Sequence, residues 1–305
     1  MKKPTYFLLA IFLFSSSLCA QDTIIPLWPD AIPNRISESE KEVREKGDIL
    51  RISKVQIPEI EVYLPAPANR NGQAVLIFPG GGYHILAYDW EGTDIAKFLN
   101  SRGIVGIVVK YRLPTSSALT ENHKVPLQDA QRAMRIVRSK AEKWGIDRNK
   151  IGIMGFSAGG HLASTLGTHF DEIVYRAKDS IDLLSARPDF MTLVYPVITF
   201  TQKSTHQGSK KALIGENPEP DLEKHFSNEL QVSAETPPTL LIHAADDLGV
   251  PVENSLLFFE ALKAHNVPAT MHIYPKGGHG FSLALNDTYL RSWTDRLLEW
   301  LETMP

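Results

Sequence analysis

The stretch Ile151–Gly160 reads Ile-Gly-Ile-Met-Gly-Phe-Ser-Ala-Gly-Gly and combines the signals of a strand, a tight turn and a helix. Its first half is apolar, as in a buried strand, and the residues after Ser157 suit a helix. Between them, Gly155-Phe156-Ser157-Ala158-Gly159 matches G-x-S-x-G, the spacing of a sharp strand-to-helix turn. The two glycines leave no side chain where the strand and helix backbones approach, so the serine hydroxyl stands exposed. We therefore predict that Ser157 is a nucleophile.

Strand and helix patterns alternate on both sides of this turn. Apolar runs typical of strands buried on both faces cover 74–78, 104–111, 190–195 and 239–243, and a last strand is expected at 270–274. Helical spacing or composition covers 93–102, 127–144, 158–168, 252–265 and 288–301. This alternation predicts an α/β fold with a mostly parallel central sheet and helices on both faces.

The domain organisation follows from the same patterns. Residues 51–305 are expected to form a single catalytic domain that begins with antiparallel strands at 52–57 and 60–64. Residues 21–50 are polar and contain Pro26, Pro29 and Pro33, which favours an extended arm over the surface. The longest departure from the alternation is 197–236, which we interpret as an insertion that partly caps the site.

The first 20 residues have the pattern of a secretory signal peptide. Lys2-Lys3 supplies the positive charge, 6–14 is apolar, and 15–20 ends in small residues, so cleavage is expected after Ala20. The apolar part is too short for a permanent membrane span. We therefore expect an exported protein, periplasmic or extracellular in a bacterium, with no transmembrane anchor after cleavage. The alternative for this stretch is a buried N-terminal helix.

Cys19 is the only cysteine, so a mature chain without it has neither disulfides nor thiolate chemistry. Lipid attachment at Cys19 is an alternative to cleavage at Ala20, but Ser16-Ser17-Leu18 does not resemble a lipobox. Loss of Lys2 and Lys3 takes the formal charge from −3 to −5, which argues against a nucleic-acid-binding surface.

A nucleophilic serine needs a base and a group that orients the base. In enzymes with a serine on such a turn, an acid follows a late strand and a histidine follows the last one. Asp246 and Asp247 directly follow the strand 239–243, and His279 lies between glycines after the strand 270–274. His279 is therefore the expected base, and both aspartates remain candidates for the acid. His161 is the rival histidine. It lies four residues, or one helical turn, after Ser157, so its ring would sit beside the helix and not opposite the hydroxyl. We therefore expect a structural role for His161.

The developing oxyanion of an ester needs preorganised donors. Pro79-Gly80-Gly81-Gly82 follows a buried strand, and glycines let backbone N–H groups point at a substrate oxygen. The N–H groups of Gly81, Gly82 and Ala158 are the candidates. A phosphate cradle is the alternative, but the loop lacks the G-K-[ST] ending of a P-loop.

Four segments together resemble a known group of enzymes. They are 78–83, 155–163, Tyr111-Arg112-Leu113-Pro114 and 247–281. The chain from about 54 to 303 is similar to the secreted acetyl xylan esterase and feruloyl esterase branch of the α/β-hydrolases, near the hormone-sensitive-lipase type. The proline at position 79, where lipase-type enzymes carry histidine, is typical of that branch.

The resemblance implies a triad of Ser157, Asp247 and His279, with Gly81, Gly82 and Ala158 as oxyanion donors. It favours Asp247 over Asp246 through the spacing His243-x-x-x-Asp247-x-x-Val250-Pro251. The implied activity is removal of acyl groups, mostly acetate, from plant polysaccharide such as xylan, without metal or cofactor. The alternatives are a feruloyl or general short-chain carboxylesterase, a prolyl-oligopeptidase-like peptidase and a non-catalytic binding module.

Overall fold

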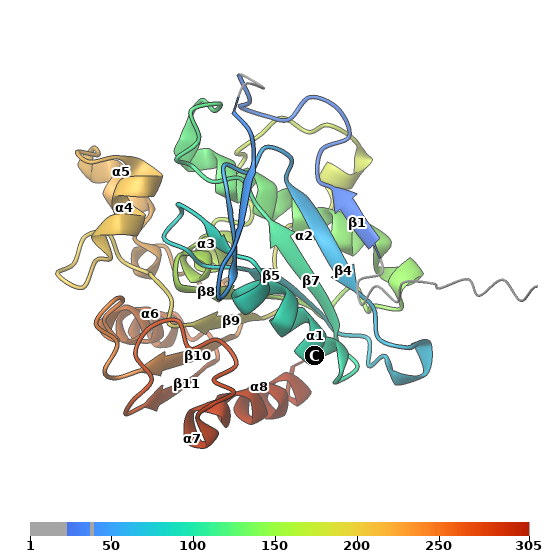
Figure 1. The fold of residues 1–305 in the computed structure, drawn as a ribbon, viewed down its shortest axis with the longest axis vertical. Coiled ribbons are helices and arrows are strands. Elements are labelled where there is room, and N and C mark those ends of the chain that lie inside the picture. Colours follow the sequence, from blue (N-terminus) through green and yellow to red (C-terminus); the bar gives the residue numbers. More distant parts are fainter. Residues whose placement is uncertain (1–22, 37–39, 305) are drawn as a thin grey trace, which may run out of the picture.

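A computed structural model describes residues 23–36 and 40–304. An eight-stranded sheet runs through its centre in the order β1-β4-β7-β5-β8-β9-β10-β11 (Figure 1). β4 pairs antiparallel with both neighbours, and all the other neighbouring pairs are parallel. The strands are β1 (Thr23–Pro26), β4 (Glu59–Tyr63), β5 (Ala74–Phe78), β7 (Val105–Lys110), β8 (Ile151–Phe156), β9 (Met191–Val194), β10 (Thr239–Ala244) and β11 (Ala269–Tyr274). The predicted mostly parallel α/β architecture is confirmed.

Helices cover both sides of this sheet. α1 and α8 lie on one side, and α2 and α3 lie on the other (Figure 1). α6 packs on β10 and β11. The helices are α1 (Asp94–Asn100), α2 (Val125–Trp144), α3 (Ser157–Thr168), α4 (Gln207–Ile214), α5 (Pro220–His225), α6 (Glu253–Ala264), α7 (Thr288–Arg291) and α8 (Trp293–Glu302). Because a parallel strand in such a sheet meets helices on both faces, its residues are expected to be buried throughout and mostly apolar.

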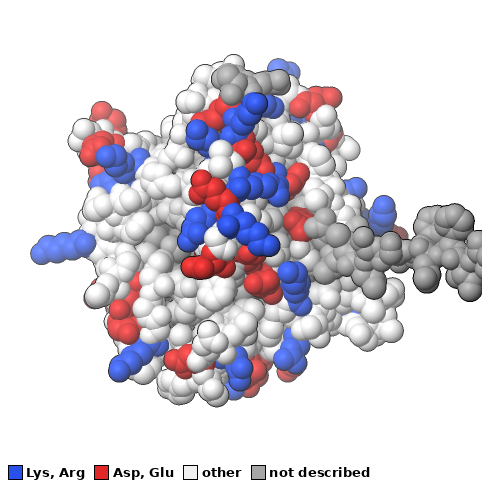
Figure 2. Space-filling view, viewed as in Figure 1, with Lys and Arg blue, Asp and Glu red and all other residues white. Residues whose placement is uncertain are grey.

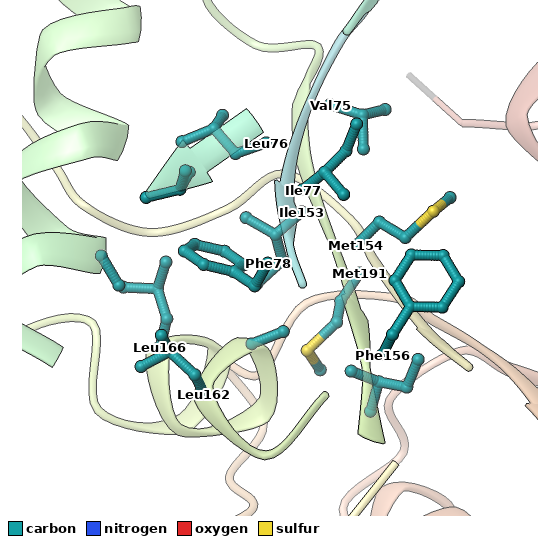
Figure 3. Packing of buried hydrophobic residues seen from close by; sticks show 14 of the residues in the cluster. Val75, Leu76, Ile77, Phe78, Ile153, Met154, Phe156, Leu162, Leu166 and Met191 are labelled. Carbon is teal, nitrogen blue, oxygen red and sulfur yellow. The ribbon is translucent and has the colours of Figure 1, made fainter. Parts of the chain in front are cut away.

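The core confirms that reasoning for the central strands. Every residue of β5, β7, β8 and β9 is buried. Figure 3 shows side chains of β5, β8 and β9 packed together with Leu162 and Leu166 of α3. The middle of α3, the helix that begins at Ser157, is therefore packed against the central sheet.

The N-terminal part contributes to the main sheet. β1 falls within the expected arm of 21–50, yet it pairs with β4 as the outermost strand. Two residues later, the Trp28 indole N–H donates to Asp129 Oδ1 on α2 at 2.8 Å. The Arg112 guanidinium binds both oxygens of the same buried carboxylate, at 2.7 and 2.9 Å. The described residues of the arm are thus joined to the interior by a strand pairing and a buried charge cluster.

A second, three-stranded sheet is formed by β2 (Val43–Lys46), β3 (Leu50–Ser53) and β6 (Leu86–Ala87). Glu45 of β2 faces Arg51 of β3, a cross-strand pair of opposite charge. Figure 2 shows acidic and basic side chains intermixed along the middle of the face that this hairpin occupies in Figure 1. The mixture leaves no broad region of one sign over the hairpin.

Short helices and loops complete the chain. The single-turn elements are η1 (Pro67–Asn69), η2 (Asp89–Thr93), η3 (Asn122–Lys124), η4 (Ser180–Leu183) and η5 (Asn228–Leu230). The 197–236 insertion lies between β9 and β10 and holds α4, α5 and η5. The predicted signal peptide, 1–20, lies outside the described residues. Within 23–36 and 40–304, no helix combines the length and apolar character that a membrane span needs.

Candidate active site

The strand-to-helix turn at Ser157 has the strained geometry that its glycines predict. Ser157 has a φ of 51°, in the left-handed region, where β8 passes into α3. A Cβ at Gly155 would lie 2.2 Å from the Gly159 carbonyl oxygen, and a Cβ at Gly159 would lie 2.1 Å from the Phe78 carbonyl oxygen. Only glycine fits at either position, because both contacts are with backbone. The turn therefore depends on close approach of α3 to the ends of β5 and β8.

Three of the predicted residues form one hydrogen-bonded chain. Ser157 Oγ lies 2.8 Å from His279 Nε2, and His279 Nδ1 lies 2.7 Å from Asp247 Oδ2. A carboxylate only accepts, so Nδ1 carries the proton and Nε2 can accept from the serine hydroxyl. Asp247 follows β10 and His279 follows β11, so three separate strand ends bring these groups together.

Asp247 is held in place by backbone N–H groups of nearby residues as well as by His279. Its Oδ1 accepts hydrogen bonds from the N–H groups of Gly249 at 2.9 Å and Val250 at 2.8 Å. His243 Nε2 lies 3.4 Å from Oδ2. Burial raises the pKa of this carboxyl, but the contacts with His243 and His279 and the Val250 N–H outweigh it and hold the pKa below its usual range. Asp247 is therefore ionised at neutral pH.

Asp246 has a different position. Its Oδ1 accepts from the Gly278 N–H at 2.8 Å and so holds the loop that carries His279. The structure thus brings Asp247, and not Asp246, into contact with the His279 ring. Trp90 supports the same loop, since its indole N–H donates to the Gly280 carbonyl at 2.8 Å.

The glycine loop after β5 presents free amides beside Ser157. Gly81 and Gly82 have φ angles of 131° and 64°, and a Cβ at Gly81 would lie 2.2 Å from the Ile85 carbonyl oxygen. Among the described residues, no hydrogen bond uses the N–H groups of Gly81, Gly82 or Ala158. The Tyr111 hydroxyl donates to the Pro79 carbonyl at 2.7 Å and fixes the start of the loop. These three amides are therefore available to a substrate oxygen.

Glu91 is a residue of the site that sequence reasoning missed. Its buried carboxylate accepts from the Gly80 N–H and from the Tyr195 hydroxyl, each at 2.8 Å. Burial raises the pKa of Glu91, although both hydrogen bonds oppose the rise. The Tyr195 hydroxyl in turn accepts from the Ser282 N–H at 3.0 Å. Glu91 thus joins the glycine loop to the segment after His279. Because Tyr195 is 104 positions away, no local pattern could have indicated this contact.

A pocket of about 340 Å³ opens over Ser157 and His279. Its other lining residues are Ile49, Gly81, Gly82, Ile85, Ala87, Trp90, Glu91, His206 and Gly280. His206 comes from the 197–236 insertion, at the start of α4. Trp90 lines this pocket, whereas the nearby Tyr83 and Tyr88 are buried.

His161 has the structural environment expected for it. The Tyr83 hydroxyl donates to His161 Nδ1 at 2.8 Å, and the ring donates from Nε2 to the Phe226 carbonyl at 2.8 Å. The imidazole also stacks on Phe200 with ring centroids 4.5 Å apart. Burial lowers its pKa to about 4, so it is neutral at pH 7. The ring therefore joins α3 to the 197–236 insertion and takes no part in the hydrogen-bonded chain of Ser157.

Comparisons with known proteins place the chain in a family. The BD-FAE family model matches residues 60–262, a segment that includes Ser157 and Asp247. The solved structure of an acetyl ester-xyloside bifunctional hydrolase, from Caldicellulosiruptor lactoaceticus, is 40% identical with a TM-score of 0.80, over 94% of this chain and 98% of that one. A carboxylesterase structure from Lactobacillus plantarum, 22% identical over 86% of this chain and 96% of that one, has the same fold with a TM-score of 0.68.

Two curated relatives are larger proteins. Endo-1,4-beta-xylanase B of Butyrivibrio fibrisolvens is 37% identical over 81% of this chain and 38% of its own length. Acetylxylan esterase of Xylanibacter ruminicola is 35% identical over 78% of this chain and 47% of its own length. The chain thus spans less than half the length of each.

Proposed function

Because the chain belongs to the BD-FAE family of α/β-hydrolases, we propose that it is a serine esterase that removes acetyl groups from xylan-type polysaccharide. One observation carries the proposal: the hydrogen-bonded chain Ser157, His279 and Asp247 stands beside unpaired backbone amides at the wall of an open pocket. Nucleophile, base, orienting carboxylate and oxyanion donors are the parts that acyl transfer requires.

The reaction runs in two halves. Ser157 Oγ attacks the ester carbonyl carbon while His279 Nε2 takes the hydroxyl proton, and the Asp247 carboxylate stabilises the imidazolium that forms. The N–H groups of Gly81, Gly82 and Ala158 bind the oxyanion. His279 then protonates the sugar oxygen as it leaves, with acetyl remaining on Ser157. Water attacks the acyl-enzyme by the same route, releasing acetate and restoring the serine.

The substrate class rests on the relatives and on the pocket. One curated relative is named acetylxylan esterase, and the 40% identical structure is that of an acetyl ester-xyloside hydrolase. A pocket of about 340 Å³ lies at the small end of the usual range for ligand sites, roughly 300–1,000 Å³. A pocket of this size suits a small acyl group, with the sugar chain remaining outside it.

The test is product release from acetylated and feruloylated xylan, with Ser157→Ala as the blank. We expect acetate from the wild type alone. Ferulate in its place would mean that the acyl pocket takes an aromatic acid, so that the protein would be a feruloyl esterase. Neither product, with turnover of a small aryl acetate retained, would refute the polysaccharide substrate and leave the esterase chemistry standing.

Two further measurements distinguish an enzyme from a binding module and test the export of the protein. A fluorophosphonate probe should label Ser157 in the folded protein, and failure to label would favour the binding module.

We also propose that the protein is exported with removal of residues 1–20. Sequencing of the mature N-terminus should then begin at Gln21, whereas lipid attached to Cys19 would support tethering.

A further inference from the structure

A cluster of metal-binding side chains lies at the end of α3 opposite to Ser157. His169 directly follows α3, Glu172 comes three residues later, and His225 is the last residue of α5. One ligand atom from each of the three lies within 4.8 Å of the other two. α3 is twelve residues long, so roughly 18 Å of helix separates the cluster from the nucleophile.

His169 carries a buried nitrogen without a partner. The residue is 8% exposed, and its Nε2 forms no hydrogen bond within the described part of the chain. Nδ1 lies 2.8 Å from Thr168 Oγ1, whose hydroxyl donates to the Ser164 carbonyl at 2.9 Å and therefore accepts from Nδ1. The Thr165 carbonyl oxygen, 3.3 Å from Nδ1, is a second acceptor for the same proton. Nδ1 therefore carries the ring proton, which leaves the lone pair on Nε2. A neutral imidazole whose other nitrogen donates to a carbonyl is the form that ligates a metal.

Glu172 presents a second unsatisfied atom to the same space. Its Oε2 is buried, has no hydrogen bond among the described residues and lies 3.4 Å from His225 Nε2. The two histidine rings are adjacent, with centroids 4.5 Å apart. Gln131 of α2 donates to the carbonyls of both His169 and Glu172, at 3.0 and 2.9 Å. One amide therefore fixes the backbone that carries two of the three groups.

We propose that His169, Glu172 and His225 bind one divalent transition-metal ion, with Zn²⁺ the best match. Two imidazoles and a carboxylate suit zinc, whereas Ca²⁺ and Mg²⁺ prefer oxygen ligands alone. Zinc bonds of about 2.0–2.1 Å put tetrahedral ligand atoms about 3.4 Å apart. The side chains of Glu172 and His225 are each 35% exposed and can close the remaining distance.

The surroundings leave room for a fourth ligand. A hollow of about 210 Å³ borders Glu172 and His225 and can hold a water molecule on the metal. Lys124 also lines this hollow, but its ammonium is paired with Glu121. The bound ion would tie α5 of the 197–236 insertion to the end of α3. Its role would be structural, because the cluster is remote from the pocket over Ser157.

The experiment is calorimetric titration of the full, chelator-treated protein with zinc chloride. We expect saturable binding of one equivalent and a higher melting temperature with zinc. His225→Ala and Glu172→Gln should each lower the zinc affinity at least about tenfold, since each removes one of three ligands. His265→Ala is the matched control, because that histidine is exposed at the end of α6 and should leave binding unchanged.

Melting of the metal-free proteins separates loss of a ligand from loss of the fold. Metal-free His225→Ala should melt at the temperature of the metal-free wild type, because the substituted side chain lies at the surface, 35% exposed. Absence of saturable zinc binding by the wild type would overturn the proposal. So would binding that survives both His225→Ala and Glu172→Gln, or that is lost equally in His265→Ala.

Discussion

Replacing Asp247 with asparagine changes one atom and should reverse the tautomer of His279. In the wild type, Oδ1 accepts from the Gly249 and Val250 amides and Oδ2 accepts from His279 Nδ1. The two backbone donors should hold the asparagine oxygen at the Oδ1 position, so the new NH₂ group faces His279. Nδ1 must then accept, which moves the ring proton to Nε2. A protonated Nε2 cannot take the proton of Ser157.

The expected loss is large because the base is removed while the fold is kept. The same substitution in a serine protease triad lowers kcat by about 10⁴-fold, which corresponds to about 5 kcal/mol of barrier. We expect a similar fall in kcat for hydrolysis of a small aryl acetate at pH 7. The thermal melting curve should stay close to that of the wild type, because the backbone hydrogen bonds to Oδ1 survive.

Asp246→Asn provides the matched control, since its carboxylate accepts a single backbone N–H, from Gly278. That bond can be kept by the asparagine oxygen, so kcat should remain within about tenfold of the wild-type value, a barrier change of no more than about 1.4 kcal/mol. The reasoning would be refuted by an Asp247→Asn enzyme that retains a tenth or more of wild-type kcat. Equal losses in the two variants would also refute it.

Three further predictions concern Gly159, Tyr195 and His161. Gly159→Ala should fail to give active folded protein, because its Cβ would lie 2.1 Å from the Phe78 carbonyl oxygen. Gly215→Ala is the control: it has open space around it, and strain at φ 89° and ψ 177° should cost about 1–3 kcal/mol of unfolding free energy. Tyr195→Phe should lower the free energy of unfolding in urea by about 1–3 kcal/mol, because Glu91 Oε1 and the Ser282 N–H lose their partner; an unchanged value would contradict this account of Glu91. The folded-state pKa of His161 is about 4, below that of the unfolded chain, so unfolded protein binds more protons and stability should fall as pH drops from about 6.5 to 4, by about 3 kcal/mol. His161→Asn should show a shallower pH dependence, and an equal slope in both proteins would assign the effect to other groups.

The sequence predicts the features of this protein that depend on local pattern. The apolar runs of β5, β7 and β8 predict a buried parallel sheet, and Gly155 and Gly159 mark the tight turn at Ser157. His279 could be chosen among ten histidines because it follows the last predicted strand, where the chain order of serine, acid and histidine places the base. Such signals need only neighbouring residues and the alternation of strands with helices.

Other features depend on contacts between distant residues and could not be predicted. β6 has two residues, too short for any strand pattern, yet it completes the second sheet with β3. The Glu91–Tyr195 hydrogen bond and the cluster of His169, Glu172 and His225 each join segments that lie far apart in the chain. Within the 197–236 insertion, polar composition did not reveal that His206 would reach the pocket.

The attachment of the N-terminal segment sets where this domain can be joined to another. The Trp28 indole donates to the same buried carboxylate that neutralises Arg112, and β1 covers the edge of β4. A shortened protein that began at residue 51 would leave Asp129 with one donor fewer and would expose a strand edge able to pair with other molecules. In a fusion protein, the linker should therefore end before Thr23, so that β1 keeps its pairing with β4.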